Sequence, residues 1–208
     1  MDDVVYVHGL WLSGHEAFLL RRRLARERGY TWHMFSYAST LLTMDAIADA
    51  LHEFIAALRV PRVHLLGHSL GGLAIMRCLE HHPAQPPGRV VFMGTPAMAS
   101  RAANAVGRFR LGRAFLGPAG RGELLNVHGR RWTHVRELGI IAGTRPLSLG
   151  RLVTKFDEDN DGAVAVSETR LPGATAHLTL PVSHTGLLLS ARVAHEVGQF
   201  LEYGHFRL

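Results

Sequence analysis

The chain has 208 residues, 47% of them hydrophobic, and a formal net charge of +6 at pH 7. This size and composition allow one full hydrophobic core, so we expect one domain over residues 1–208. No apolar run is long enough to cross a membrane, and Met1-Asp2-Asp3 lacks the basic and apolar regions of a signal peptide. The lone Cys78 cannot form an internal disulfide. We therefore expect a cytoplasmic protein.

The surplus of basic residues raises the question of a nucleic-acid partner. Much of this surplus lies between residues 101 and 131, in a segment rich in glycine. The sequence has no aromatic-interleaved RNA motif, zinc-finger spacing or helix-turn-helix pattern. We therefore predict no nucleic-acid partner. The basic segment is interpreted as a contact for an anionic surface or substrate, or as a solvated face.

Short apolar runs alternate with amphipathic stretches along the whole chain. In chain order, the predicted elements are strand 4–7, helix 16–28, strand 31–37, helix 43–59, strand 62–66, helix 70–81, strand 89–93, strand 138–142, strand 176–182 and helix 186–203. Near-continuous apolar strands that alternate with helices are typical of a doubly wound, mostly parallel sheet. The sequence therefore predicts an α/β fold.

A serine stands between glycines where the strand 62–66 meets the helix 70–81, in the sequence G-H-S-L-G-G. Such a junction reverses the chain within a few residues, so Ser69 is expected to have a strained backbone that bulky neighbours would obstruct. The hydroxyl would then stand above the sheet, with a helix N-terminus behind it to favour developing negative charge. Ser69 is therefore a candidate nucleophile. The alternative is a glycine-rich turn with a capping serine.

Ligands of doubly wound sheets bind at the carboxyl ends of the strands. The residues that follow the predicted strands are His8-Gly9-Leu10-Trp11, Ser69, Gly94-Thr95-Pro96, the acidic run 157–162 and Ser183-His184-Thr185. A nucleophile, an acid and a histidine thus occur in the chain order Ser69, Asp161, His184, all expected at one edge of the sheet.

This arrangement resembles the α/β-hydrolase superfamily, specifically its small lipase-like and GPI inositol-deacylase-like members. The matching motifs are V-H-G-L at 7–10, G-H-S-L-G-G at 67–72, G-T-P at 94–96, D-G-A-V at 161–164 and H-T-G-L at 184–187. The resemblance implies a minimal α/β-hydrolase fold without the antiparallel first strands of larger relatives. Residues 99–131 are then the candidate lid.

Carried over to this sequence, the resemblance implies that Ser69 is the nucleophile, His184 its base, and Asp161 the acid that orients the imidazole. Asp157 and Asp159 of the same run are the alternatives for the acid, and Asp161 fits the family pattern best. The backbone N–H groups of Leu10 and Leu70 would form the oxyanion hole. Residues expected to support the loop and the substrate are His8, Gly9, Trp11 and His68. The implied reaction is hydrolysis of a small-molecule or lipid ester through an acyl-serine, with no cofactor.

The same fold permits other activities. Thioesterases and amidases use the same three groups, and a non-catalytic binding module can keep the fold without the chemistry. The acidic run adds a calcium-binding alternative, because its spacing matches an EF-hand loop. The candidate ligands are Asp157, Asp159, Asp161 and Glu168. An EF-hand also needs a helix on each side, and Pro172-Gly173 ends any exiting helix, so we predict no metal site.

The insert at residues 99–131 has two interpretations. Phe109, Leu111, Phe115 and Leu116 alternate with arginines, which suits a lid that makes transient contact with an anionic membrane surface. The other interpretation is an irregular surface segment that covers one edge of the sheet. Because the segment is rich in glycine, we expect no firm amphipathic helix in it.

Overall fold

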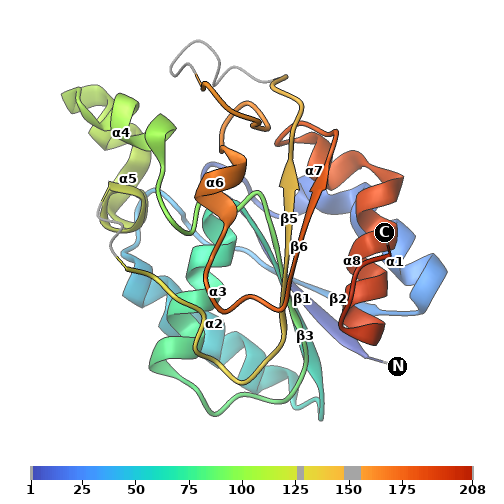
Figure 1. Ribbon diagram of the computed structural model, residues 1–208. Helices are drawn as coiled ribbons and strands as arrows, with labels where there is room; N and C mark the ends of the chain where they lie inside the picture. The colour runs from blue at the N-terminus through green and yellow to red at the C-terminus, as the bar shows by residue number, and fades with distance from the viewer. Residues whose placement is uncertain (1, 126–128, 148–155, 208) are drawn as a thin grey trace.

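The computed structural model describes residues 2–125, 129–147 and 156–207. A parallel sheet lies between two layers of helices (Figure 1). Its six strands run in the order β2-β1-β3-β4-β5-β6. They are β1 (Asp3–Val7), β2 (Thr31–Phe35), β3 (Val63–His68), β4 (Val90–Met93), β5 (Leu138–Gly143) and β6 (Ala176–Leu180). All five strand pairings are parallel. The predicted α/β-hydrolase architecture is confirmed.

Eight α-helices and one short 3-10 helix, η1 (His15–Ala17), are assigned within the described residues. The α-helices are α1 (Phe18–Arg28), α2 (Met44–Leu58), α3 (Leu70–His81), α4 (Arg101–Gly107), α5 (Arg110–Leu125), α6 (Val166–Thr169), α7 (Gly186–Leu189) and α8 (Ala191–Tyr203). In Figure 1, α2 and α3 cover one face of the sheet, and α1 and α8 cover the other.

The sheet is buried on both faces because successive strand residues point to opposite sides. In β1, Val5 and Val7 join the core under α2 and α3, whereas Val4 and Tyr6 join the core under α1 and α8. All four side chains are fully buried. Each of the three buried valines contributes roughly 1.5–3 kcal/mol of hydrophobic stabilisation. This two-sided burial explains the near-continuous apolar runs in the sequence.

The helix predicted over residues 186–203 is divided in two. Ser190 has an extended backbone (φ −74°, ψ 131°) and separates α7 from α8. Its hydroxyl accepts a hydrogen bond from the N–H of Val193 at 3.4 Å. A serine in this conformation caps the start of a new helix, so the break has a local cause.

The insert is helical, which contradicts the expectation that its glycines prevent a firm helix and disfavours the interpretation as an irregular segment. Ser100 caps the start of α4 by accepting from the N–H of Ala103 at 3.2 Å. The chain kinks within α5 at Gly117 (φ 64°, ψ 179°), directly before Pro118. A Cβ at Gly117 would lie 2.5 Å from the backbone oxygen of Thr40, so only glycine fits this turn. Residues 126–128 of the insert lie outside the described residues.

The helices α4 and α5 together are called the cap below. The cap rests on the body of the molecule through Leu116 and Leu124, which are buried in the core shared with α2 and α3. Its glycines did not prevent helix formation, because these contacts stabilise the segment after it docks. Within the described residues, no helix is both long and apolar enough to cross a membrane.

Candidate active site

Ser69 occupies a strained turn between β3 and α3. Its backbone has φ 54° and ψ −122°, a conformation that non-glycine residues rarely adopt. Glycines surround it because there is no space for side chains. A Cβ at Gly67 would lie 2.6 Å from the Cα of Gly72, and one at Gly71 would lie 2.1 Å from the oxygen of Val7. The Ser69 N–H donates to the oxygen of Met93 at 2.9 Å, which ties the turn to β4.

His184 and Asp161, from the loops after β6 and β5, form a close pair. The Nδ1 of His184 lies 2.7 Å from Oδ2 of Asp161. Because a carboxylate only accepts, Nδ1 carries the proton and Nε2 keeps its lone pair. The second carboxylate oxygen accepts from the N–H groups of Ala163 at 2.9 Å and Val164 at 2.8 Å. Asp161 is therefore fixed in orientation, and only 1% of its surface is exposed.

The pair changes the proton affinity of both groups. Burial lowers the pKa of His184, but the charge of Asp161 and its hydrogen bond outweigh burial and raise that pKa above its ordinary value. Burial also opposes ionisation of Asp161. The positive charge and hydrogen bond of His184, with the two backbone N–H groups, nevertheless hold the pKa of Asp161 below its ordinary value. The site therefore keeps a charged carboxylate that stabilises an imidazolium.

Two glycines at the strand ends make room for this pair, a role that the sequence analysis did not assign. Gly94 (φ 58°) follows β4, and a Cβ there would lie 3.0 Å from both Asp161 Oδ2 and His184 Nδ1. A Cβ at Gly143 would lie 2.8 Å from the Cβ of Asp161. In the sequence, this role could have been inferred from the glycines that stand at the ends of two adjacent strands, β4 and β5.

Ser69 borders two cavities. The smaller, of about 170 Å³, is also lined by Leu10, His68 and His184. The larger, of about 320 Å³, is lined mainly by apolar residues, including Leu10, Leu70 and several residues of the cap. The cap residues on its wall include Val106, Phe115, Leu116 and Leu124. The candidate nucleophile thus stands where a small cavity with a histidine meets a larger apolar cavity.

The N–H groups of Leu10 and Leu70 are available beside Ser69. Neither makes a hydrogen bond with another described residue, and both residues line the larger cavity with Ser69. The Leu70 N–H belongs to the first turn of α3, where helix geometry leaves N–H groups without partners. The loop at Leu10 can lie close to Ser69 because Gly9 has no side chain. A Cβ at Gly9 would lie only 3.0 Å from the Cβ of Ser69.

His8 and Trp11 hold this loop in place. The Nδ1 of His8 donates to the oxygen of Gly9 at 2.8 Å, and its Nε2 accepts from the N–H of Tyr37 at 3.2 Å. The Tyr37 hydroxyl donates to the oxygen of His8 at 2.7 Å. Trp11 has a positive φ of 62°, and its N–H donates to the hydroxyl of Ser39 at 3.0 Å. His8 is thus a neutral brace, with a pKa lowered by burial.

His68 lies directly beside the Asp161–His184 pair. Its Nε2 donates to the backbone oxygen of His184 at 3.1 Å, and the two imidazole centroids are 4.7 Å apart. Burial, together with the positive charge of a protonated His184, lowers the pKa of His68 to about 3. Its Nδ1 has no hydrogen-bond partner among the described residues. His68 therefore stays neutral where His184 titrates, and it positions the backbone of His184.

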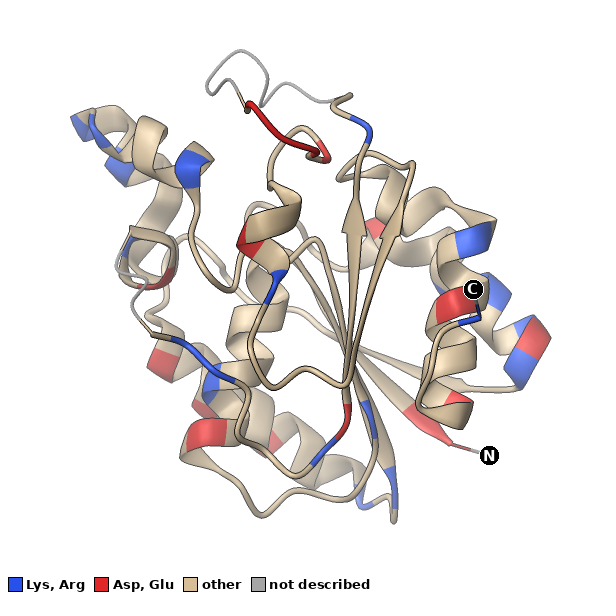
Figure 2. Ribbon diagram, in the orientation of Figure 1, with Lys and Arg blue, Asp and Glu red and all other residues tan. Residues whose placement is uncertain are grey.

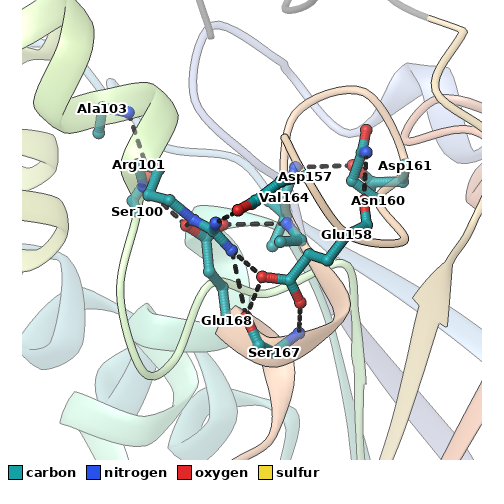
Figure 3. A network of polar contacts seen from close by, with 11 residues as sticks. Ser100, Arg101, Ala103, Asp157, Glu158, Asn160, Asp161, Val164, Ser167 and Glu168 are labelled. Carbon is teal, nitrogen blue, oxygen red and sulfur yellow. Dashed lines mark hydrogen bonds and ion pairs between the residues drawn. The ribbon is translucent and has the colours of Figure 1, made fainter. Parts of the chain in front are cut away.

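The loop that carries Asp161 is tied to the cap by Arg101, as Figure 3 shows. Arg101 donates to Oε1 of Glu168 through its backbone N–H at 2.7 Å and through Nε at 3.2 Å. Its guanidinium also pairs with Asp157 at 3.2 Å and with Glu158. Glu168 is 2% exposed, and its other oxygen accepts from the N–H of Ala165 at 3.0 Å.

These contacts engage three of the four candidate calcium ligands in other interactions. Asp157 and Glu168 are turned to Arg101, whereas Asp161 is turned to His184. The helix after the loop, α6, has only four residues. Within residues 2–125, 129–147 and 156–207, no group of three or more His, Cys, Asp or Glu side chains is placed to hold a metal ion. In this structure Asp157, Asp161 and Glu168 thus belong to a hydrogen-bonded turn and an ion-pair network, and the absence of a metal site stays a prediction.

The sequence matches a family model over most of its length. Residues 4–198 fit the model described as the alpha/beta hydrolase family. The chain belongs to the alpha/beta hydrolase family. The matched span includes Ser69, Asp161 and His184 and most of the sheet. The narrower likeness to GPI inositol deacylases stays a prediction. No curated protein matches the sequence of this alpha/beta hydrolase.

Solved structures of related enzymes share the fold. The mature form of the Bacillus licheniformis lipase BlEst2 gives a TM-score of 0.76 at 21% identity, covering 98% of this chain and 92% of the lipase. The metagenomic carboxyl esterase MGS0156 gives a TM-score of 0.65 at 20% identity, and the match covers 88% of this chain and 64% of the esterase. The RedJ thioesterase of Streptomyces coelicolor gives a TM-score of 0.63 at 15% identity, and the match covers 95% of this chain and 85% of the thioesterase. At these identities the likeness concerns the fold of this alpha/beta hydrolase.

Proposed function

We propose that this alpha/beta hydrolase cleaves carboxylic esters with apolar acyl groups through an acyl-serine intermediate. The observation that carries the proposal is the 2.7 Å hydrogen bond between His184 Nδ1 and Asp161 Oδ2, with Ser69 and His184 on the wall of one cavity. A histidine held in this tautomer presents Nε2 as a base. No cofactor is needed for this chemistry.

In the first half of the reaction, the Ser69 hydroxyl attacks the ester carbonyl carbon and its proton moves to Nε2 of His184. The carbonyl oxygen becomes negative and accepts hydrogen bonds from the N–H groups of Leu10 and Leu70. Each such donor lowers the barrier by about 3 kcal/mol. The bond to the alcohol oxygen then breaks, and that oxygen takes the proton from His184. The acyl group remains on Ser69.

In the second half, water replaces the alcohol. His184 Nε2 takes a proton from the water as the water oxygen attacks the acyl carbon, and the bond to the Ser69 oxygen breaks. The serine oxygen recovers the proton from His184, and a carboxylic acid leaves. Asp161 stays ionised throughout and stabilises the imidazolium that forms in each half.

The two cavities favour an apolar acyl group and a smaller alcohol. An apolar cavity of about 150 Å³ holds one benzene ring, so the larger cavity of about 320 Å³ has room for roughly twelve carbon atoms. The smaller cavity of about 170 Å³ includes the polar residues Glu16 and Thr185. We assign the acyl chain to the larger cavity and the alcohol to the smaller one, since apolar walls favour burial of methylene groups.

A panel of p-nitrophenyl esters from acetate to palmitate tests the proposal. We expect the highest kcat/KM for chains of roughly eight to twelve carbons, from the cavity volume, and a loss of at least ~10⁴-fold in Ser69→Ala. Ser36→Ala removes an exposed serine elsewhere and is the matched control. Equal turnover by wild type and Ser69→Ala, or labelling by a fluorophosphonate at a residue other than Ser69, would contradict the proposal.

A thioester is the second candidate substrate, favoured by the shared fold with the RedJ thioesterase. Thioesterases and amidases use the same nucleophile, base and oxyanion hole, so the nature of the leaving group decides between them. Comparing kcat/KM for an acyl thioester, ester and amide with one acyl chain distinguishes the three activities. Binding of these compounds without turnover would favour the non-catalytic binding module.

A further inference from the structure

Exposed apolar side chains lie on the cap and on the loop after β1 that contacts it. Trp11, Phe109, Leu111 and Phe115 are 57%, 69%, 87% and 53% exposed, and they are called the cap stripe here. Leu111 and Phe115 are four residues apart on α5 and so share one face. The ring of Phe115 lies 5.2 Å from that of Trp11, whose Nε1 donates to the Phe115 oxygen at 3.0 Å. The stripe is therefore built from two segments distant in sequence.

Unpaired positive charge accompanies the stripe. Arg108, Arg110 and Arg113 are exposed, and none of them pairs with a carboxylate among the described residues. Residues 101–122 contain no aspartate or glutamate. Figure 2 shows the outer end of the cap in blue and tan without red. Arg101, at the first position of α4, pairs with three carboxylates, whereas these three arginines pair with none that the structure describes. The charge of the cap is thus left for an external partner.

The cap stripe also connects to the candidate active site. Phe115 belongs both to the stripe and to the wall of the larger cavity that borders Ser69. Val106 and Leu116, on either side of it in sequence, line the same cavity. A molecule that contacts the outside of the cap is therefore next to the wall of the cavity assigned to the acyl chain.

We infer that the cap stripe and its three arginines dock this alpha/beta hydrolase on an anionic lipid surface. Aromatic and aliphatic side chains enter the boundary between headgroups and acyl chains, while arginines contact the phosphates. Like charge argues against a second copy of the chain, because two-fold pairing would place Arg108, Arg110 and Arg113 against the same residues. Entry of an acyl chain from the membrane rests on the proposed esterase function, whereas docking does not.

Sedimentation with vesicles tests the docking. We expect the protein to sediment with vesicles of phosphatidylcholine mixed with phosphatidylglycerol, and far less with phosphatidylcholine alone. Binding should weaken as salt is added, because salt screens exposed charges. Equal binding to both kinds of vesicle, or binding to neither, would overturn the inference.

Variants locate the surface. Leu111→Ser and the double variant Arg110→Gln/Arg113→Gln should each weaken vesicle binding, the latter by ~30-fold if each arginine contributes one lipid contact. Matched controls are Val135→Ser, which changes a side chain that is 95% exposed away from the cap, and Arg22→Gln/Arg26→Gln on the exposed side of α1. Equal losses of vesicle binding in the cap variants and in these controls would show a nonspecific attraction to the vesicles and would overturn the inference.

The test separates failure of docking from failure of the esterase proposal. The cap variants should keep wild-type turnover of a soluble short-chain ester, because Leu111, Arg110 and Arg113 do not line the cavities at Ser69. Vesicle binding without any ester turnover would contradict the proposed function and leave docking intact. A concentration-dependent dimer abolished by Leu111→Ser would instead assign the stripe to a second copy and overturn the inference.

Discussion

At the scale of single residues, Asp161 makes His184 a stronger base than a buried histidine would otherwise be. The raised pKa of His184 has a direct kinetic consequence, because the imidazole must be neutral to accept the proton of Ser69. As the pH falls through that pKa, the base becomes protonated and kcat/KM declines. We therefore expect the acidic limb of the pH profile to lie above the ordinary histidine pKa of about 6.5.

Replacing Asp161 by asparagine reverses this shift. Without the charge of Asp161, burial governs His184 and lowers its pKa, so the acidic limb should move below about 6.5. We expect kcat to fall by roughly 10³–10⁴-fold, since the imidazole also loses its fixed tautomer. Asp159→Asn is the matched control, because this neighbouring carboxylate is exposed. A wild-type pH profile in Asp161→Asn would show that another group orients the base.

Gly94 is a second residue whose replacement should affect turnover. An added Cβ would lie 2.8 Å from Leu187 and 3.0 Å from the Asp161 and His184 atoms that form the hydrogen bond. Gly94→Ala should therefore separate the pair and lower kcat/KM by at least ~10-fold, in keeping with the cost of small displacements at a reacting centre. Gly122→Ala is a control with open space around the Cβ. Equal kcat/KM in the two variants would contradict this account.

At the scale of elements, Arg101 links the cap to the loop of Asp161. Arg101→Gln would leave the buried carboxylate of Glu168 with fewer donors. Because the arginine side chain is 38% exposed, we expect a modest loss of roughly 1–2 kcal/mol in the free energy of unfolding, well below that of a fully buried pair. Arg108→Gln, which removes an unpaired charge from the same cap, should change stability little. Chemical denaturation of both variants measures the difference, and equal losses would contradict the link.

The elements also show what the sequence could and could not predict. The strands were predictable because apolar runs on a two-sided sheet are continuous, and parallel strands bring the residues after them to one edge. The cap helices were not, because their stability depends on the docking of Leu116 and Leu124 rather than on local propensity. The contact between Arg101 and Glu168 joins residues 67 positions apart, and no local pattern marks it.

At the scale of the whole molecule, buried and half-buried histidines contribute to the response to acid. Loss of contact with solvent lowers the pKa of five of them, with that of His68 at about 3 and that of His177 at about 4. The other three are His8, His64 and His134. Such a histidine binds a proton more readily in the unfolded chain. It therefore stabilises the fold fully above pH ~6.5, and this contribution is lost as pH falls toward the folded pKa.

We accordingly expect the free energy of unfolding to decrease from pH ~6.5 toward pH ~4. His177→Gln should make this decrease less steep, because glutamine can keep the hydrogen bond to Thr169 and does not titrate. His184, with its raised pKa, acts in the opposite direction. Urea denaturation at a series of pH values measures the slope. A slope unchanged by His177→Gln would mean that this histidine keeps a similar pKa in both states.

The distribution of the site along the chain has a consequence for folding. The turn at Ser69 forms between adjacent elements, β3 and α3, whereas His184 is placed only when β6 has paired with β5 and α7 has followed. Contacts between distant parts of a chain form more slowly than local ones, because a longer loop must close. During refolding from denaturant, helical circular dichroism should therefore recover before ester turnover. The rate at which turnover recovers would then measure how fast β6 pairs with β5 and places His184.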